Sequence, residues 1–152
     1  YKGKYVVVDF WASWCPDCRK DAPNIVALYE KFHKKGVEFL GVSFDRNQES
    51  WKKGVEALRL PYTQVSDLKN MRESDVAQAY HISWIPTVYV IDPQGNVALA
   101  TVMSEKVAAY LTSVFPDCEE NWFESWDLKS WELWYADKHV NIIVLSTYHN
   151  SQ

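Results

Sequence analysis

A nearly continuous apolar run that ends at two closely spaced cysteines constrains this chain more than any other feature. Residues 6–18 read VVVDFWASWCPDC. The β-branched or aromatic residues at positions 6–8 and Phe10 form a nearly continuous run, which is typical of a strand covered on both faces. From Cys15 onward the polarity changes, and apolar residues recur at helical spacing. The segment therefore predicts a buried strand, a tight turn and the start of a helix.

The two cysteines fall at the start of the expected helix. Pro16 takes the first helical position, where its missing amide hydrogen costs no hydrogen bond. Cys15 therefore lies at the helix N-terminus, where the helix dipole and free N–H groups stabilise a thiolate. Cys18 lies one turn further in, close enough for a disulfide and more sheltered. This arrangement favours a dithiol that is oxidised and reduced in turn.

Zinc sites use the same cysteine spacing, so the number of available ligands has to be considered. A structural zinc ion takes four ligands, usually with a second pair of Cys or His residues at ligand spacing. The other cysteine and the histidines of this chain are isolated from one another in the sequence: Cys118, His33, His81, His139 and His149. The sequence therefore predicts no metal site at the cysteine pair.

The sequence of residues 6–18 resembles the active-site signature of thioredoxin-fold oxidoreductases, in which a VDFWA strand end leads to WCxxC. Pro23 stands where thioredoxins carry the proline that kinks the active-site helix. The sequence WIPT at residues 84–87 resembles the cis-proline loop of the family, and PQGN at residues 93–96 resembles its following hairpin turn. The resemblance covers about residues 5–115.

The segment between Cys18 and Pro86 is longer than in a minimal thioredoxin. In this respect the chain is similar to the bacterial TlpA/ResA-type extracytoplasmic proteins, which carry a central helix-and-strand insertion. The resemblance implies an α/β, thioredoxin-like fold: a central mixed sheet flanked by helices, with that insertion. It also implies a bacterial, extracytoplasmic location, in the periplasm or anchored to a membrane and facing it.

Hydrophobic periodicity predicts elements in the order β-α-β-α-β-α-β-β-α, which fits a mixed sheet with helices on both faces. After the first strand, further strands are expected at residues 37–44, 63–66, 88–92 and 97–102. Helices are expected where apolar residues recur at helical spacing, within residues 22–32, 51–58, 76–80 and 107–114.

The composition changes after Pro116. The following residues contain no glycine or proline yet hold several tryptophans, and the family resemblance does not cover them. We therefore divide the chain into a thioredoxin-like domain at residues 1–116 and a C-terminal extension at residues 117–152. The extension is expected to form a helix over residues 119–136 and a strand over residues 141–145. Packing of both on the core is favoured, with a partner-binding patch as the alternative.

Charge and composition also bear on possible partners. The formal net charge is −4 at pH 7 and the sequence has no basic run, so no nucleic-acid binding is expected. No apolar stretch approaches the ~20 residues needed to cross a bilayer. The chain begins at Tyr1 without an initiator methionine, so we expect a missing N-terminal segment. Membrane anchoring through that segment is left open.

The resemblance implies that Cys15 attacks a disulfide as a thiolate and that Cys18 resolves the mixed disulfide. Asp9 lies in an otherwise apolar strand, where a buried carboxylate is costly unless it is paired or neutralised. It matches the thioredoxin position that resembles a proton acceptor for the second cysteine, and burial should raise its pKa. Capping of a backbone amide is the alternative. The glutamate of TlpA/ResA-type proteins has no match, since Asp45 and Arg46 stand in that region.

A second group of residues is expected to bind the substrate. The resemblance implies a cis bond before Pro86, which exposes the backbone of Ile85 beside the cysteine pair for an extended substrate to join like an added strand. Trp14 and Trp84 flank this place and could form an apolar rim, with ordinary packing as the alternative. Pro16 is also expected to contact the substrate.

These features predict an enzyme, a thiol–disulfide oxidoreductase that acts on protein thiols or disulfides. We expect it to work as a reductant in an extracytoplasmic compartment and to exchange electrons with an upstream redox partner. No cofactor is expected beyond the redox-active Cys15–Cys18 disulfide. Two alternatives are a copper or other metal chaperone and a binding module with a vestigial dithiol. Copper-delivery relatives space their cysteines as CxxxC, and the presence of Asp9 and Pro86 together with the dithiol argues against a vestigial site.

Overall fold

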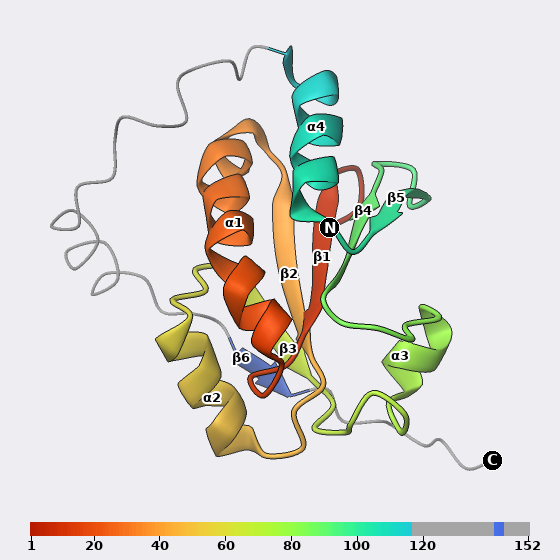
Figure 1. Ribbon diagram of the computed structural model, residues 1–152. Coiled ribbons are helices and arrows are strands. Elements are labelled where there is room, and N and C mark those ends of the chain that lie inside the picture. The colour runs from red at the N-terminus through yellow and green to blue at the C-terminus, as the bar shows by residue number, and fades with distance from the viewer. Residues whose placement is uncertain (117–141, 145–152) are drawn as a thin grey trace, which may run out of the picture.

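A six-stranded mixed sheet organises the computed structural model, which describes residues 1–116 and 142–144 (Figure 1). The strand order across the sheet is β5-β4-β1-β2-β3-β6. In chain order the strands are β1 (Val6–Trp11), β2 (Glu38–Ser43), β3 (Thr63–Ser66), β4 (Thr87–Ile91), β5 (Val97–Thr101) and β6 (Ile142–Val144).

The strand β1 is central, and all six of its residues are buried. It pairs in parallel with β2, and β2 and β6 both run parallel to β3. On its other side β1 pairs with β4 in the antiparallel sense, and β5 continues the sheet as the hairpin partner of β4. A strand with neighbours on both sides and covered faces must be apolar, which is why its sequence is nearly continuous in β-branched and aromatic residues.

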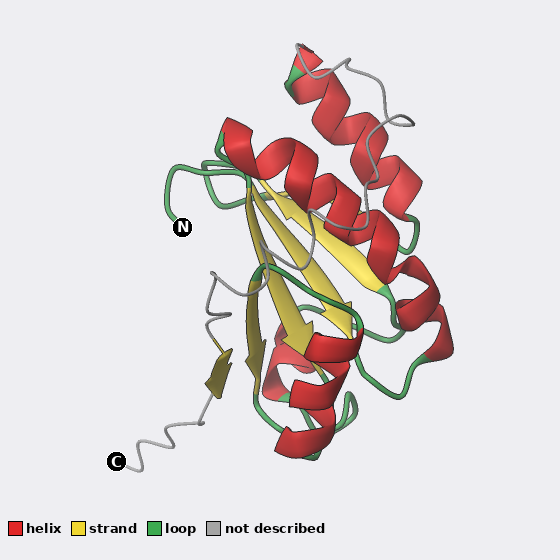
Figure 2. Cartoon of the chain, turned by 90° about the vertical axis from the view of Figure 1, so that its left-hand side faces the viewer, coloured by secondary structure: helices red, strands yellow, loops and turns green. Residues whose placement is uncertain are grey.

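Helices flank the sheet (Figure 2). The two longest, α1 and α4, pack against each other on the same face (Figure 1). No helix in the described part of the chain is both long and apolar enough to span a bilayer. The helices are α1 (Pro16–Phe32), the short 3-10 helix η1 (His33–Lys35), α2 (Gln48–Ala57), α3 (Asp75–Ala79) and α4 (Ser104–Val114).

The predicted order of elements and the α/β thioredoxin-like architecture are confirmed. The strand expected at residues 141–145 is present as β6, which extends the same sheet next to β3. The helix expected at residues 119–136 lies outside the described residues, as does Cys118. The division of the chain at Pro116 stays a prediction.

The inserted segment comprises α2 and β3, and β3 is fitted closely against β2. The buried side chain of Gln64 lies over Gly41, the residue that pairs with it in β2, and a Cβ atom at Gly41 would lie 2.1 Å from Oε1 of Gln64. The same Oε1 accepts a hydrogen bond of 3.0 Å from the indole Nε1 of Trp11. A buried amide needs such partners, so the missing side chain at Gly41 makes room for a polar link between β1 and β3.

We predict that Gly41→Ala lowers the free energy of unfolding by about 1–3 kcal/mol, because the new methyl group displaces the carboxamide of Gln64. Denaturant unfolding followed by circular dichroism measures this loss. In a Gln64→Ala background the same substitution should cost clearly less, because the group it collides with is gone. Strictly additive losses in the two backgrounds would show that the collision is not the cause.

Candidate active site

Cys15 and Cys18 lie where β1 leads into α1. Cys15 is the N-cap of α1, with extended backbone angles (φ −85°, ψ 114°), and Pro16 follows at the start of the helix. The Sγ atom of Cys15 accepts the backbone N–H of Cys18 at 3.2 Å. Both cysteines are free thiols. A backbone donor from the first helical turn therefore points at the Cys15 sulfur.

The two cysteines are almost equally buried, so Cys18 is more sheltered than Cys15 only by a small margin. The exposed fraction is 5% for Cys15 and 4% for Cys18. Cys15 is covered because the loop before β4 lies against it, and its Sγ is 3.8 Å from the backbone oxygen of Ile85. A substrate must therefore reach the sulfur beside this loop.

The loop before β4 is brought to the cysteines by strand pairing. Thr87, the first residue of β4, lies opposite Phe10 near the end of β1. The peptide bond between Ile85 and Pro86 is cis, and both residues are buried. The hydroxyl of Thr87 donates to the backbone oxygen of Trp84 at 2.7 Å and so holds the loop in shape.

The two tryptophans predicted beside the site do not pack in the core. The exposed fraction is 58% for Trp14 and 63% for Trp84. Pro16 is exposed as well. Trp14 directly precedes Cys15, and Trp84 directly precedes the residue whose carbonyl meets the Cys15 sulfur. Two exposed aromatic side chains therefore adjoin the two backbone segments that meet at the Cys15 sulfur.

Asp9 lies in the middle of β1 with only 6% of its surface exposed. Its Oδ2 atom accepts a hydrogen bond of 3.0 Å from the hydroxyl of Tyr62. Its recorded side-chain partner is thus a phenol, not the backbone amide considered as the alternative. Burial raises the pKa of Asp9 from 3.8 to about 7, the Tyr62 hydrogen bond opposes this, and the negative charge of Asp21 adds to it. A carboxyl group with this pKa can both take and release a proton near neutral pH.

The environment of Cys18 favours the neutral thiol over the thiolate. Burial raises its pKa far above the ordinary value, and the hydrogen bond with Cys15 and the negative charge of Asp9 add to the effect. A thiol of this kind becomes a nucleophile only when a neighbouring base removes its proton. The charge of Asp9 is among the influences that act on Cys18.

A second buried carboxylate, Asp45, organises the turn before the cysteines. Its oxygens accept the backbone N–H of Ser13 at 3.0 Å, the Ser13 hydroxyl at 2.6 Å and the Ser43 hydroxyl at 2.7 Å. Only 2% of Asp45 is exposed. Three donors on one carboxylate hold the end of β2 and the turn of β1 together. Arg46 points elsewhere, is exposed and lies 3.9 Å from Glu73.

The chain can now be compared with known proteins. The model of the AhpC/TSA family matches residues 1–100. The chain belongs to this family. It is 33% identical over 119 residues to the thiol-disulfide oxidoreductase ResA of Geobacillus kaustophilus, a match that covers 76% of this chain and 66% of that relative. The chain thus spans just under two thirds of the length of this relative.

Solved structures of thiol-disulfide oxidoreductases share the fold. The thioredoxin domain of a thiol-disulfide oxidoreductase from Bacteroides vulgatus is 34% identical, with a TM-score of 0.68 over 74% of this chain and 80% of that one. A thiol:disulfide interchange protein from Bacteroides sp. is 32% identical, with a TM-score of 0.67 over 80% and 79% of the two chains. The resemblance to TlpA/ResA-type proteins with a thioredoxin-like fold is therefore confirmed.

Two features of the site were missed at the level of the sequence. Tyr62 is 53 residues away from Asp9, and nothing in its neighbourhood marks it as the partner of a carboxyl group. The contact between Asp45 and Ser13 spans 32 residues. The sequence gives a weak indication of this contact. Ser13 and Asp45 each follow an apolar strand, and buried polar groups in such places need a partner.

We predict that Asp9→Asn stabilises the protein at neutral pH but not in acid. With a pKa of 3.8 unfolded and about 7 folded, the carboxyl binds more protons in the folded state between these values. The free energy of unfolding therefore falls as pH rises from about 4 to 7 and stays low above that range. Three pKa units correspond to a cost on the order of 4 kcal/mol. Asn cannot titrate and lacks this cost.

Denaturant unfolding of both proteins between about pH 4 and 8 tests this prediction, since the titration window of Asp9 lies inside that range. The stability difference should be small at the acid end and should grow toward neutral pH. Parallel pH curves for Asp9→Asn and the wild-type chain would show that Asp9 is charged at little cost.

Proposed function

We propose that this chain catalyses thiol–disulfide exchange with protein substrates, with Cys15 as the nucleophile and Cys18 as the resolving thiol. The observation that carries the proposal is the Cys15 thiol at the N-terminus of α1, within 3.2 Å of a helical N–H and one turn from a second free thiol. The names of the relatives support the same chemistry, because they are thiol-disulfide oxidoreductases.

In the first step the Cys15 thiolate attacks one sulfur of a substrate disulfide. An S–S bond forms between Cys15 and the substrate, the substrate S–S bond breaks, and its other sulfur leaves as a thiolate. In the second step Cys18 attacks the Cys15 sulfur and displaces the remaining substrate sulfur. The chain ends as a Cys15–Cys18 disulfide, having lost two electrons, and the substrate ends as two thiols.

Asp9 accepts and then releases the proton that moves in the second step. Cys18 must lose its proton to attack, and the substrate thiolate that leaves must gain one. Asp9 accepts the proton from Cys18 as a general base, and a carboxyl group whose pKa is about 7 can pass it on to the leaving thiolate. Burial keeps bulk water away from this transfer, since Asp9 and Cys18 are both nearly inaccessible.

We further propose that the chain acts as a reductant outside the cytoplasm and is itself re-reduced by an upstream dithiol. The support is the similarity to ResA-type thiol-disulfide oxidoreductases. Equilibration of the Cys15–Cys18 pair with a glutathione redox series measures the reduction potential and so tests the direction of electron flow. A metal-carrier role has less support, because no group of three candidate ligands lies together within the described residues.

We predict that Cys18→Ser accumulates mixed disulfides with a protein substrate and that Cys15→Ser does not. The reason is kinetic, since the resolving thiol normally breaks the intermediate faster than it builds up. Incubation with insulin, quenching with acid and non-reducing electrophoresis would show the adduct as a heavier band that a reductant removes. Equal trapping by the two variants would contradict the assignment of nucleophile and resolving thiol. Tight zinc or copper binding without trapping would favour the metal-carrier function.

We also predict that Trp84→Ala raises KM for insulin by about 5–10-fold, as expected when an exposed ring loses its contact with an apolar chain. KM for glutathione disulfide should change little, because this small substrate reaches the sulfur without covering the rim. Initial rates with both substrates measure the effect.

Tyr1→Ala is the matched control for Trp84→Ala. Tyr1 has a similar exposed fraction, 57%, but lies before the start of β1, at the end of that strand away from the cysteines. Tyr1→Ala should leave KM for insulin and KM for glutathione disulfide unchanged. An equal rise of KM for insulin in the two variants would remove Trp84 from the substrate-binding surface.

A further inference from the structure

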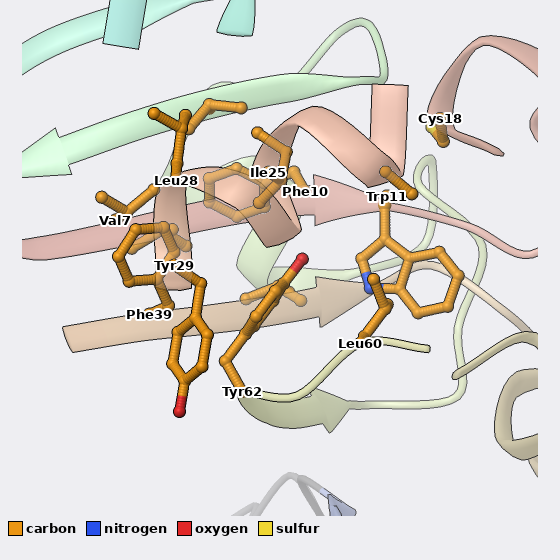
Figure 3. Packing of buried hydrophobic residues seen from close by; sticks show 14 of the residues in the cluster. Val7, Phe10, Trp11, Cys18, Ile25, Leu28, Tyr29, Phe39, Leu60 and Tyr62 are labelled. Carbon is orange, nitrogen blue, oxygen red and sulfur yellow. The ribbon is translucent and has the colours of Figure 1, made fainter. Parts of the chain in front are cut away.

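One hydrogen bond joins the inserted segment to the carboxyl group of Asp9. Tyr62 stands directly before β3, and its hydroxyl donates to Oδ2 of Asp9 at 3.0 Å. The exposed fraction is 3% for Tyr62 and 6% for Asp9, so solvent does not readily replace this donor. In Figure 3 the Tyr62 hydroxyl points toward β1 and α1, whereas the hydroxyl of the neighbouring Tyr29 points the other way.

The ring of Tyr62 is held from several sides. It packs against the rings of Tyr29 and Phe39, with centroids 5.7 Å and 5.9 Å away. Its backbone oxygen accepts Nε2 of Gln64 at 3.4 Å, and Oε1 of Gln64 is in turn bound by the indole of Trp11. A donor fixed in this way keeps its direction without reorganising during a reaction, which is the condition for an effective electrostatic contribution.

We propose that Tyr62 is a positioning residue of the exchange reaction, whose hydroxyl orients the Asp9 carboxyl and favours the ionised form that takes the proton of Cys18. This inference rests on the proposed function and extends it to the inserted segment. The proton still moves from Cys18 to Asp9 and then to the leaving substrate thiolate, so Tyr62 neither gains nor loses one.

The charges around Asp9 explain why such a donor matters. The titratable groups that face it are Cys18 and Asp21 from α1 and Tyr62 from the inserted segment. Burial and the negative charge of Asp21 both favour the neutral carboxyl, and the Tyr62 hydrogen bond is the recorded interaction that favours the charged one. Burial and the nearby Asp9 also raise the pKa of Tyr62 well above its usual value, so Tyr62 remains a donor throughout.

The test compares Tyr62→Phe with Tyr29→Phe in the full chain. Both variants remove one hydroxyl from rings in mutual contact, but only the first removes a donor to Asp9. The reduced protein is mixed with 5,5′-dithiobis(2-nitrobenzoic acid), and stopped-flow absorbance follows thionitrobenzoate release. Every protein in the comparison, the reference included, carries Cys118→Ser, so the first release reports attack by Cys15 and the second reports the Cys18 step. Rates are taken between about pH 5 and 9, which brackets the titration of a base near neutral pH.

Loss of the hydrogen bond in Tyr62→Phe should move the acid-side midpoint of the second release upward by about one pH unit. The rate at the alkaline plateau should stay near the wild-type rate, and Tyr29→Phe should keep the wild-type midpoint. Replacement of Tyr62 by 3,5-difluorotyrosine, a stronger donor of the same shape, should move the midpoint downward. A carboxyl-carbon NMR titration of Asp9 in the same proteins should shift in the same directions.

Other results would overturn specific steps. An unchanged midpoint in Tyr62→Phe, or a rate lowered equally at every pH, would leave Tyr62 a packing residue only. If the rate of the second release in Asp9→Asn fell at acid pH as it does in the wild-type chain, the base would not be Asp9. The proposed proton transfer would then be wrong. Absence of a second release in the wild-type chain would instead refute the exchange by Cys15 and Cys18 itself.

Discussion

The burial of the Asp9 carboxyl group in the central strand is the constraint on which the rest of the site depends. A charged group without a counter-ion at this depth is expensive, so the protein holds it as a neutral acid over much of the acidic pH range. The cost is tolerated because β1 is otherwise fully apolar and anchored on both sides by β2 and β4. The same burial makes the carboxyl useful, since it moves the pKa to a value suited to proton transfer at neutral pH.

The sheet places the reacting groups by its topology. The parallel pairing of β1 with β2 brings their carboxyl ends together, where Asp45 ties Ser13 to the end of β2. The antiparallel pairing of β1 with β4 brings the start of β4 to the same edge, so the carbonyl of Ile85 meets Cys15. Three distant segments of the chain thus converge on one thiol, and each is held by backbone pairing in addition to its own side chains. Because several interactions hold these segments at once, the turn between β1 and Cys15 keeps a fixed geometry.

The features that could be predicted best from the sequence are those that depend on a few neighbouring residues and their chemistry. The run before Cys15 predicts a buried strand and Pro16 predicts a helix start, because both follow from backbone physics over a few residues. Asp9 could be singled out since a carboxyl in an apolar strand needs an explanation. Its partner Tyr62 could not be predicted, because a contact across 53 residues depends on the order of the strands in the sheet. The burial of Cys15 could not be predicted for a similar reason: it is covered by a loop that is distant in sequence.

Protonation and redox state must be linked in this site. The negative charge of Asp9 raises the pKa of Cys18, and by reciprocity a Cys18 thiolate disfavours the charge on Asp9. Formation of the Cys15–Cys18 disulfide removes the thiolate and with it this repulsion, so oxidation favours the ionised carboxyl. The proton that Asp9 accepts in the second step is therefore held less tightly once the disulfide has formed. In the proposed mechanism this change favours release of the proton to the departing substrate thiolate, which returns Asp9 to the charged form.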